Sequence, residues 1–118
     1  MHEMGILAQM IDIVEENCKK NNVKKIEAIS VEVGELSGVL PIFLEEYWPL
    51  VIEGNQLFED SKLNIRTIPG QALCKECNAV YNVMKFEGRC PRCKSRDKKI
   101  LGGQDFMLKD ITIKETIN

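Results

Sequence analysis

Apolar residues near the start of the chain recur at spacings of three and four: Met4, Leu7, Ile11, Val14 and Cys18. This spacing places them on one face of a helix. Two lysines at positions 19 and 20 follow, and cations are favourable at the negative end of a helix dipole. The pattern predicts an amphipathic helix over about residues 4–20.

A second helix is predicted after Pro41, a residue well suited to a first helical turn. Apolar pairs then recur every four residues: Phe43 and Leu44, Tyr47 and Trp48, Val51 and Ile52. The apolar face is therefore broad, and we expect this helix to end at residues 54–55.

Three strands are predicted from period-two alternation. The first contains Ile29, Val31 and Val33, and it ends at Gly34. The second covers about residues 62–68, with Leu63, Ile65 and Thr67 on one face, and the third covers about 106–115. A strand–helix–strand order favours parallel neighbours, whereas the third strand can pair in either direction.

The 118 residues fit one domain with a small insert, and a hydrophobic fraction of 44% is that of a folded protein. The net charge of −2 disfavours a dedicated nucleic-acid binder. The chain has no long apolar run and no basic start followed by an apolar stretch. We therefore expect no membrane span, no signal peptide and a cytoplasmic protein.

Four cysteines form two CxxC pairs separated by twelve residues: Cys74, Cys77, Cys90 and Cys93. Each pair brings two sulfurs to one tight turn, and two such turns complete a tetrahedral site. Zinc is preferred over iron, and disulfides conflict with the expected compartment. Because four thiolates leave no open position, the predicted role is structural. Cys18, on the apolar helix face, is interpreted as a small buried hydrophobe.

These elements predict an α/β fold: a small mixed three-stranded sheet with two helices, plus an inserted four-cysteine zinc domain. The predicted boundaries are 1–69 and 102–118 for the α/β domain and 70–101 for the zinc domain.

The chain's single histidine is His2. If Met1 is the natural start, the α-amine, the backbone nitrogen of His2 and its imidazole Nδ1 can chelate one ion. A strong nitrogen field favours planar or tetragonal ions such as nickel(II) and copper(II). Glu3 can complete the sphere through its carboxylate or its amide nitrogen.

Three features together resemble the HypA family of nickel metallochaperones. They are the Met1–His2–Glu3–Met4 start of a helix, the segment Val33–Gly34–Glu35–Leu36–Ser37–Gly38–Val39, and the paired CxxC module. The resemblance covers the whole chain. It implies a nickel site at His2, with Glu3 and the Met1 amine, and a structural zinc site on the four cysteines. It also implies work with a nickel-handling GTPase and docking on the hydrogenase large subunit, and in some organisms a role in urease maturation.

A zinc-ribbon module that binds nucleic acid is the alternative. Residues 74–99 carry eight cations and three carboxylates, a formal +5, whereas the remaining eight cations and fifteen carboxylates give −7. We favour the interpretation that these cations solvate loops and offset thiolates, since Tyr81 and Phe86 are the module's only aromatics for base stacking.

Catalysis is not expected. The sequence has no histidine beyond His2 for a general base, no phosphate-binding glycine loop and no nucleophile motif. Exchange of the insert between two chains would give a homodimer, and the sequence leaves that state open.

Overall fold

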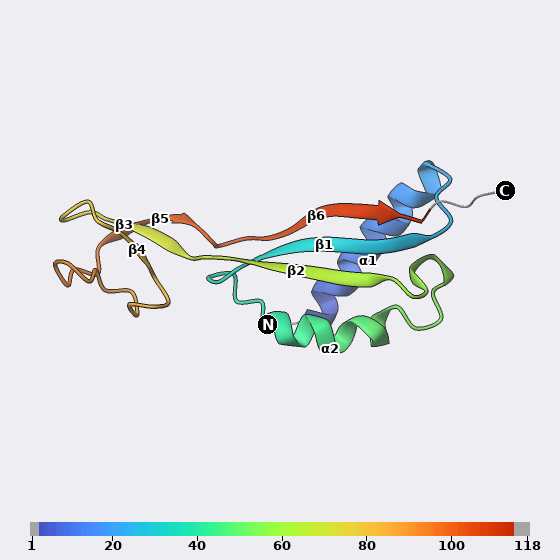
Figure 1. Ribbon diagram of the computed structural model, residues 1–118, viewed down its shortest axis with the longest axis horizontal. Coiled ribbons are helices and arrows are strands. Elements are labelled where there is room, and N and C mark those ends of the chain that lie inside the picture. The colour runs from blue at the N-terminus through green and yellow to red at the C-terminus, as the bar shows by residue number, and fades with distance from the viewer. Residues whose placement is uncertain (1–2, 115–118) are drawn as a thin grey trace.

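The computed structural model describes residues 3–114. Its elements follow the order α1 (Glu3–Lys20), β1 (Ile26–Gly34), α2 (Pro41–Val51), the 3-10 turn η1 (Gln56–Phe58), β2 (Lys62–Ile68), β3 (Gln71–Cys74), β4 (Val80–Asn82), β5 (Lys98–Gly102) and β6 (Phe106–Ile113). The molecule is elongated, 62 × 23 × 19 Å, with both helices at one end (Figure 1).

The predicted mixed sheet is confirmed. Its strand order is β2–β1–β6, with β1 parallel to β2 and antiparallel to β6. In the central strand Val31 pairs with Ile65 of β2, and Ile29 pairs with Ile111 of β6. Helix α2 supplies the crossover that a parallel pair requires.

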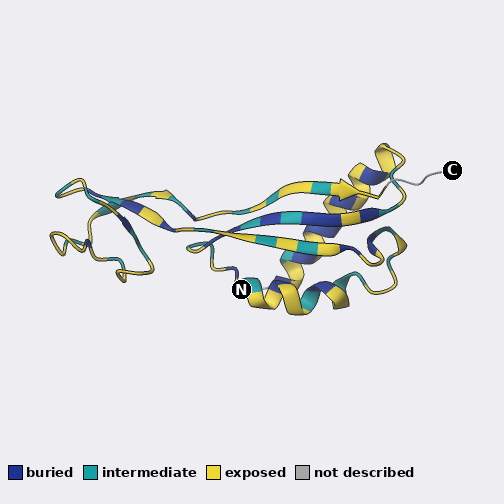
Figure 2. Ribbon diagram, in the orientation of Figure 1, coloured by how far each residue is buried: buried dark blue, intermediate teal, exposed yellow. Residues whose placement is uncertain are grey.

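The main core lies between α1, the sheet and α2. Figure 2 shows buried residues concentrated along α1 and β1. The largest fully buried side chains of this core include Phe58, Leu7, Ile29 and Leu44. Trp48 of α2 meets Phe58 edge to face at 5.7 Å, and its indole N–H donates to the Ser61 carbonyl at 3.3 Å. These contacts hold α2 against the end of the sheet.

The predicted helices need two corrections. In α1 the predicted positions Leu7, Ile11, Val14 and Cys18 are buried, but Met4 is 47% exposed whereas Glu3 is only 5% exposed. The carboxylate of Glu3 has a backbone partner, so it can be buried in place of the methionine. Helix α2 ends at Val51 rather than at residues 54–55, and Gly54 adopts a left-handed φ of +76° beyond it.

A second three-stranded sheet, β4–β3–β5, forms at the other end of the molecule. We call this part, residues 71–102, the cysteine module. Its own core is small: Ala72, Cys74, Tyr81 and Cys90 are the buried residues. So few apolar side chains do not stabilise a segment of this size, and another source of stability is needed.

The two sheets meet where three chain segments cross, residues 34–36, 68–70 and 103–105, which we call the junction. Backbone N–H groups join the segments: Gly34 donates to Asp105 at 2.8 Å, Glu35 to Ile68 at 2.9 Å and Leu36 to Gly103 at 2.7 Å. The Glu35 carboxylate also accepts from the Gly70 N–H at 2.8 Å and from the Asn82 side chain at 3.0 Å. Glu35 therefore ties the main sheet to the cysteine module.

Glycines allow this crossing to be so close. A Cβ on Gly34 would lie 2.2 Å from the Gly103 carbonyl oxygen, and one on Gly103 would lie 2.4 Å from the Pro69 oxygen. A Cβ on Gly70 would lie 2.5 Å from the Leu36 side chain. Gly103 also has a φ of +87°, which side-chain-bearing residues rarely adopt. The junction thus depends on the absence of side chains at three positions.

Candidate metal centres

The four paired cysteines converge at the far end of the cysteine module. One sulfur from each of Cys74, Cys77, Cys90 and Cys93 lies within 4.8 Å of all the others. The Cys74 and Cys93 sulfurs are 3.4 Å apart, and those of Cys77 and Cys90 are 3.5 Å apart. A tetrahedral ion with bonds of about 2.3 Å separates its sulfur ligands by roughly 3.8 Å. The sulfurs therefore already surround a position that fits one zinc ion.

The two CxxC turns have the same backbone construction. The N–H four residues after each first cysteine donates to that cysteine's carbonyl: Asn78 to Cys74 at 2.9 Å, and Lys94 to Cys90 at 2.8 Å. The backbone N–H of each first cysteine in turn donates to the carbonyl oxygen of the residue five positions later: Cys74 to Ala79, and Cys90 to Ser95. Asn78 and Lys94 both have positive φ, 64° and 68°. Two equivalent loops thus present the sulfurs from opposite sides.

The thiol pKa values show how the cluster behaves without an ion. Burial raises the pKa of Cys90, but the backbone N–H groups of Cys93 and Arg92 and the neighbouring thiols outweigh it and lower it to about 6. At Cys93 the Ser95 backbone N–H acts to lower the pKa, but the other cysteines and burial prevail and raise it to about 12. The Cys90 thiolate thus forms easily, whereas the raised pKa values of Cys93 and Cys77 oppose further thiolates, so a cation that neutralises the repulsion between thiolates suits the site.

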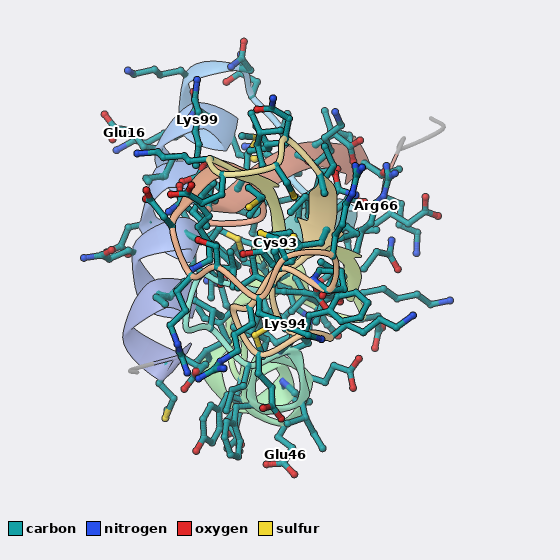
Figure 3. The ribbon with its side chains drawn as sticks, turned by 90° about the vertical axis from the view of Figure 1, so that its left-hand side faces the viewer. Glu16, Glu46, Arg66, Cys93, Lys94 and Lys99 are labelled. Carbon is teal, nitrogen blue, oxygen red and sulfur yellow. The ribbon has the colours of Figure 1, made fainter. Side chains whose placement is uncertain are left out.

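A bound metal ion would supply the stability that the small core of the cysteine module does not provide. Two of the four ligands, Cys74 and Cys90, are also fully buried members of that core. Figure 3 views the molecule from this end, where Cys93 lies near the centre of the projection with Lys94 below it. All four donors are thiolates, so the donor set is that of a closed structural zinc site.

The expected nickel site begins outside the described residues, because Met1 and His2 precede them. Glu3 is described, and it is the first residue of α1. Its side chain is buried, and its Oε2 accepts from the backbone N–H of Leu40 at 3.2 Å. The carboxylate therefore anchors the start of α1 to the segment that leads into α2.

Comparison with known proteins decides the family. Residues 1–113 match the profile of the family described as hydrogenase/urease nickel incorporation, metallochaperone, hypA. The chain belongs to the HypA family.

Individual HypA proteins match over almost their whole length. The hydrogenase maturation factor HypA of Moorella thermoacetica is 34% identical over 108 residues, which is 92% of this chain and 95% of that protein. The Campylobacter jejuni protein of the same name is 29% identical over 97% of this chain and all of its own. The solution structure of the nickel metallochaperone HypA from Helicobacter pylori has a TM-score of 0.65 and 27% identity over 96% of this chain and 97% of its own.

Membership of HypA confirms the resemblance drawn from the N-terminal motif, the Val33–Val39 segment and the paired cysteines. It establishes a nickel-binding metallochaperone of hydrogenase maturation, and its four-cysteine cluster fits a structural zinc site. The nucleic-acid alternative is correspondingly disfavoured. No helix among residues 3–114 is long and apolar enough to cross a membrane.

Cys18 is confirmed as a buried apolar residue in this HypA-family chain. It is 5% exposed on the core side of α1, and burial raises the pKa of its thiol. A raised pKa keeps the thiol protonated and unreactive. The residue lies outside the metal cluster formed by the other cysteines.

Sequence reasoning missed Glu35 as a residue that connects the two parts. It forms bonds to Gly70 and Asn82, 35 and 47 positions away. The available signal was its place in the Val33–Val39 motif, between two glycines at the end of a predicted strand. The segment from Gly34 onward also ends at Leu40, whose N–H is held by Glu3, so one short loop connects the junction with the start of α1.

Proposed function

We propose that this chain carries nickel(II) on a chelate built from its first three residues and passes the ion to the hydrogenase large subunit during maturation. The proposed ligands are the Met1 amine, the backbone nitrogen and imidazole of His2, and Glu3. The proposed zinc ligands are Cys74, Cys77, Cys90 and Cys93, in a zinc domain of residues 70–101 inserted into the nickel-binding α/β domain.

The anchored Glu3 is the observation that carries the nickel proposal. Its carboxylate is buried and bonded to Leu40, so the residue adjoining His2 has a defined place. The side chain of Glu3 therefore fixes the start of α1, and the ligand that Glu3 offers is either its backbone nitrogen or its carboxylate.

A terminal chelate suits delivery rather than storage. Nitrogen ligands at the end of a chain can be replaced one after another by those of an acceptor, without unfolding the donor. We propose that the chain acts in the cytoplasm with a nickel-handling GTPase, and that it binds and transfers the metal without catalysing a reaction. The maturation-factor names of its relatives support this role.

Calorimetric titration of nickel into zinc-loaded, untagged protein tests the proposal. Wild type should bind about one ion per chain, whereas His2→Ala and a variant with one residue added before Met1 should lose that binding. Loss in His2→Ala alone would contradict a role for the amine. Equal binding by all three would place nickel elsewhere and refute the terminal chelate.

Glu3→Gln separates the two roles of Glu3. Glutamine keeps an oxygen that can accept from Leu40, so affinity should remain close to wild type if the backbone nitrogen is the ligand. Glu3→Ala removes the anchor and should weaken binding. A loss in Glu3→Gln as large as that in Glu3→Ala would instead identify the carboxylate as the ligand.

A further inference from the structure

Helix α2 exposes an unusual amount of apolar surface for a helix whose other side is packed. Leu44 and Trp48 face the core, yet Ile42 and Leu50 are 61% and 59% exposed. Leu40, just before the helix, is half exposed, and Phe43 is partly exposed. Clustered exposed apolar side chains, unlike scattered single ones, are characteristic of interaction sites.

These side chains form a continuous ridge. Phe43, Tyr47 and Leu50 occupy positions i, i+4 and i+7 of α2, which lie above one another on a helix. The Phe43 and Tyr47 rings stack with centroids 6.1 Å apart. We call the ridge, together with Leu40 and Ile42, the α2 face. An aromatic and aliphatic ridge of this spacing is what a helix presents to a partner's groove.

The charges on α2 and its flanks have one sign. Residues 40–54 contain no lysine or arginine, but they contain three carboxylates. These are Glu45, Glu46 and Glu53, and all three are exposed. None of these three forms an ion pair within the described part of the chain. Figure 3 shows Glu46 pointing away from the body of the molecule. A complementary surface would be apolar with lysine or arginine at its rim.

The α2 face adjoins the nickel end of the chain. Leu40 is held by Glu3 through the 3.2 Å hydrogen bond, and the exposed Met4 follows Glu3 in α1. Direct transfer requires acceptor ligands to reach the ion while it is still held. An acceptor that reaches residues 1–3 must therefore lie against the protein surface beside Glu3, and the α2 face is part of that surface.

We propose that the α2 face is the docking site for the protein that accepts nickel, and that this partner contributes an apolar groove edged by basic side chains. The inference rests on the proposed nickel site for its choice of partner. Apolar contacts of Ile42, Phe43 and Leu50 supply most of the affinity, and the carboxylates orient the partner.

Binding of the purified nickel-free precursor of the hydrogenase large subunit tests this docking, with nickel absent from both proteins. The test variant is Ile42→Asp combined with Leu50→Asp. Ile13→Asp is the matched control, because Ile13 is an isoleucine of α1 with a similar exposure of 56%. We expect the double variant to weaken binding by at least about tenfold and the control by less than about twofold. Unchanged melting temperatures would show that both variants remain folded.

Charge reversal provides a second measurement. Glu46→Lys should weaken the same binding and reduce its sensitivity to salt, whereas Glu15→Lys on α1 should not. Equal binding by the α2 variants and their controls would overturn the proposal. The proposal would also be overturned if the α2 variants bound the precursor normally but lost binding to the GTPase or lost self-association, because the α2 face would then bind a different partner.

The nickel titration separates this inference from the proposed function. If the α2 variants bind nickel normally but fail to bind the precursor, the docking site is supported. If wild type binds the precursor through the α2 face but holds no nickel at its N-terminus, the terminal chelate is refuted. The α2 face would then be a docking surface without a role in nickel transfer, and this would overturn the proposal as stated.

Discussion

Alanine substitutions at four glycines test whether close packing at the junction stabilises the protein. The four positions separate two costs, that of steric overlap and that of a left-handed backbone. Gly102 has neither, since nothing lies within 4 Å of its Cβ position. Gly54 has a φ of +76° in open space, Gly34 has overlap alone, and Gly103 has both.

The expected magnitudes follow from these distances. A carbon needs roughly 3.3 Å from a carbonyl oxygen, so a Cβ on Gly34, 2.2 Å from the Gly103 oxygen, requires a shift of about 1 Å. Such a shift disrupts the bonds that Gly34 and Leu36 donate across the junction, each worth about 0.5–1.5 kcal/mol. A left-handed φ adds about 1–2 kcal/mol for a residue with a Cβ.

We therefore expect unfolding free energies to fall by about 2 kcal/mol in Gly34→Ala and about 1 kcal/mol in Gly54→Ala. Gly103→Ala combines both effects and should lose about 3 kcal/mol, whereas Gly102→Ala should change little. Urea unfolding of zinc-loaded protein, followed by fluorescence of the single tryptophan, Trp48, measures these values. Equal stability of the Gly102 and Gly103 variants would refute the packing argument.

Two predictions concern pH. In zinc-free protein the Cys90 pKa of about 6 lies below that of an ordinary thiol, so its thiolate stabilises the fold at higher pH and this contribution is lost as pH falls through 6. Thiolate absorbance near 240 nm should therefore rise around pH 6 and should vanish in Cys90→Ser; a first rise only above about pH 8 would contradict the cluster geometry. Hydrogen bonds from Gly70 and Asn82 hold the pKa of Glu35 below its usual range, so their stabilisation is present above the usual carboxyl pKa and lost as pH falls through the lowered value. The protection factor of the Gly70 amide, which is its exchange rate relative to an unstructured amide at the same pH, should therefore fall in acid for wild type but stay constant for Glu35→Gln. Identical acid responses of the two proteins would show that the carboxylate does not hold the junction.

The sequence was most informative where structure depends on local pattern. The spacing in α1, the alternation in β1 and the proline at the start of α2 all predicted their elements, because each reflects one periodicity or one backbone constraint. The paired CxxC motif likewise predicted a site that needs only tight turns. Its ligands converge because each turn repeats the same hydrogen bonds after Cys74 and Cys90.

Features that depend on distant contacts were missed or misplaced. Periodicity assigned Met4 to the buried face, but the partner that allows Glu3 to be buried instead is the backbone of Leu40, 37 residues away. The end of α2 was predicted too late, because apolar residues continue past Val51 into the turn that covers the core. The junction glycines could be recognised individually as strand ends, but their mutual contact is set by how three segments cross.

The close contact between Gly103 and residues 69–70 also has an evolutionary consequence. The chain leaves the main body and returns to it at nearly the same point, so the stretch between behaves as a cassette. Closing a loop whose ends already touch requires little rearrangement of the parent fold. A duplication, shortening or replacement of this stretch can therefore be accepted without moving β2 or β6, so the cysteine module can change while the helical end of the molecule stays intact.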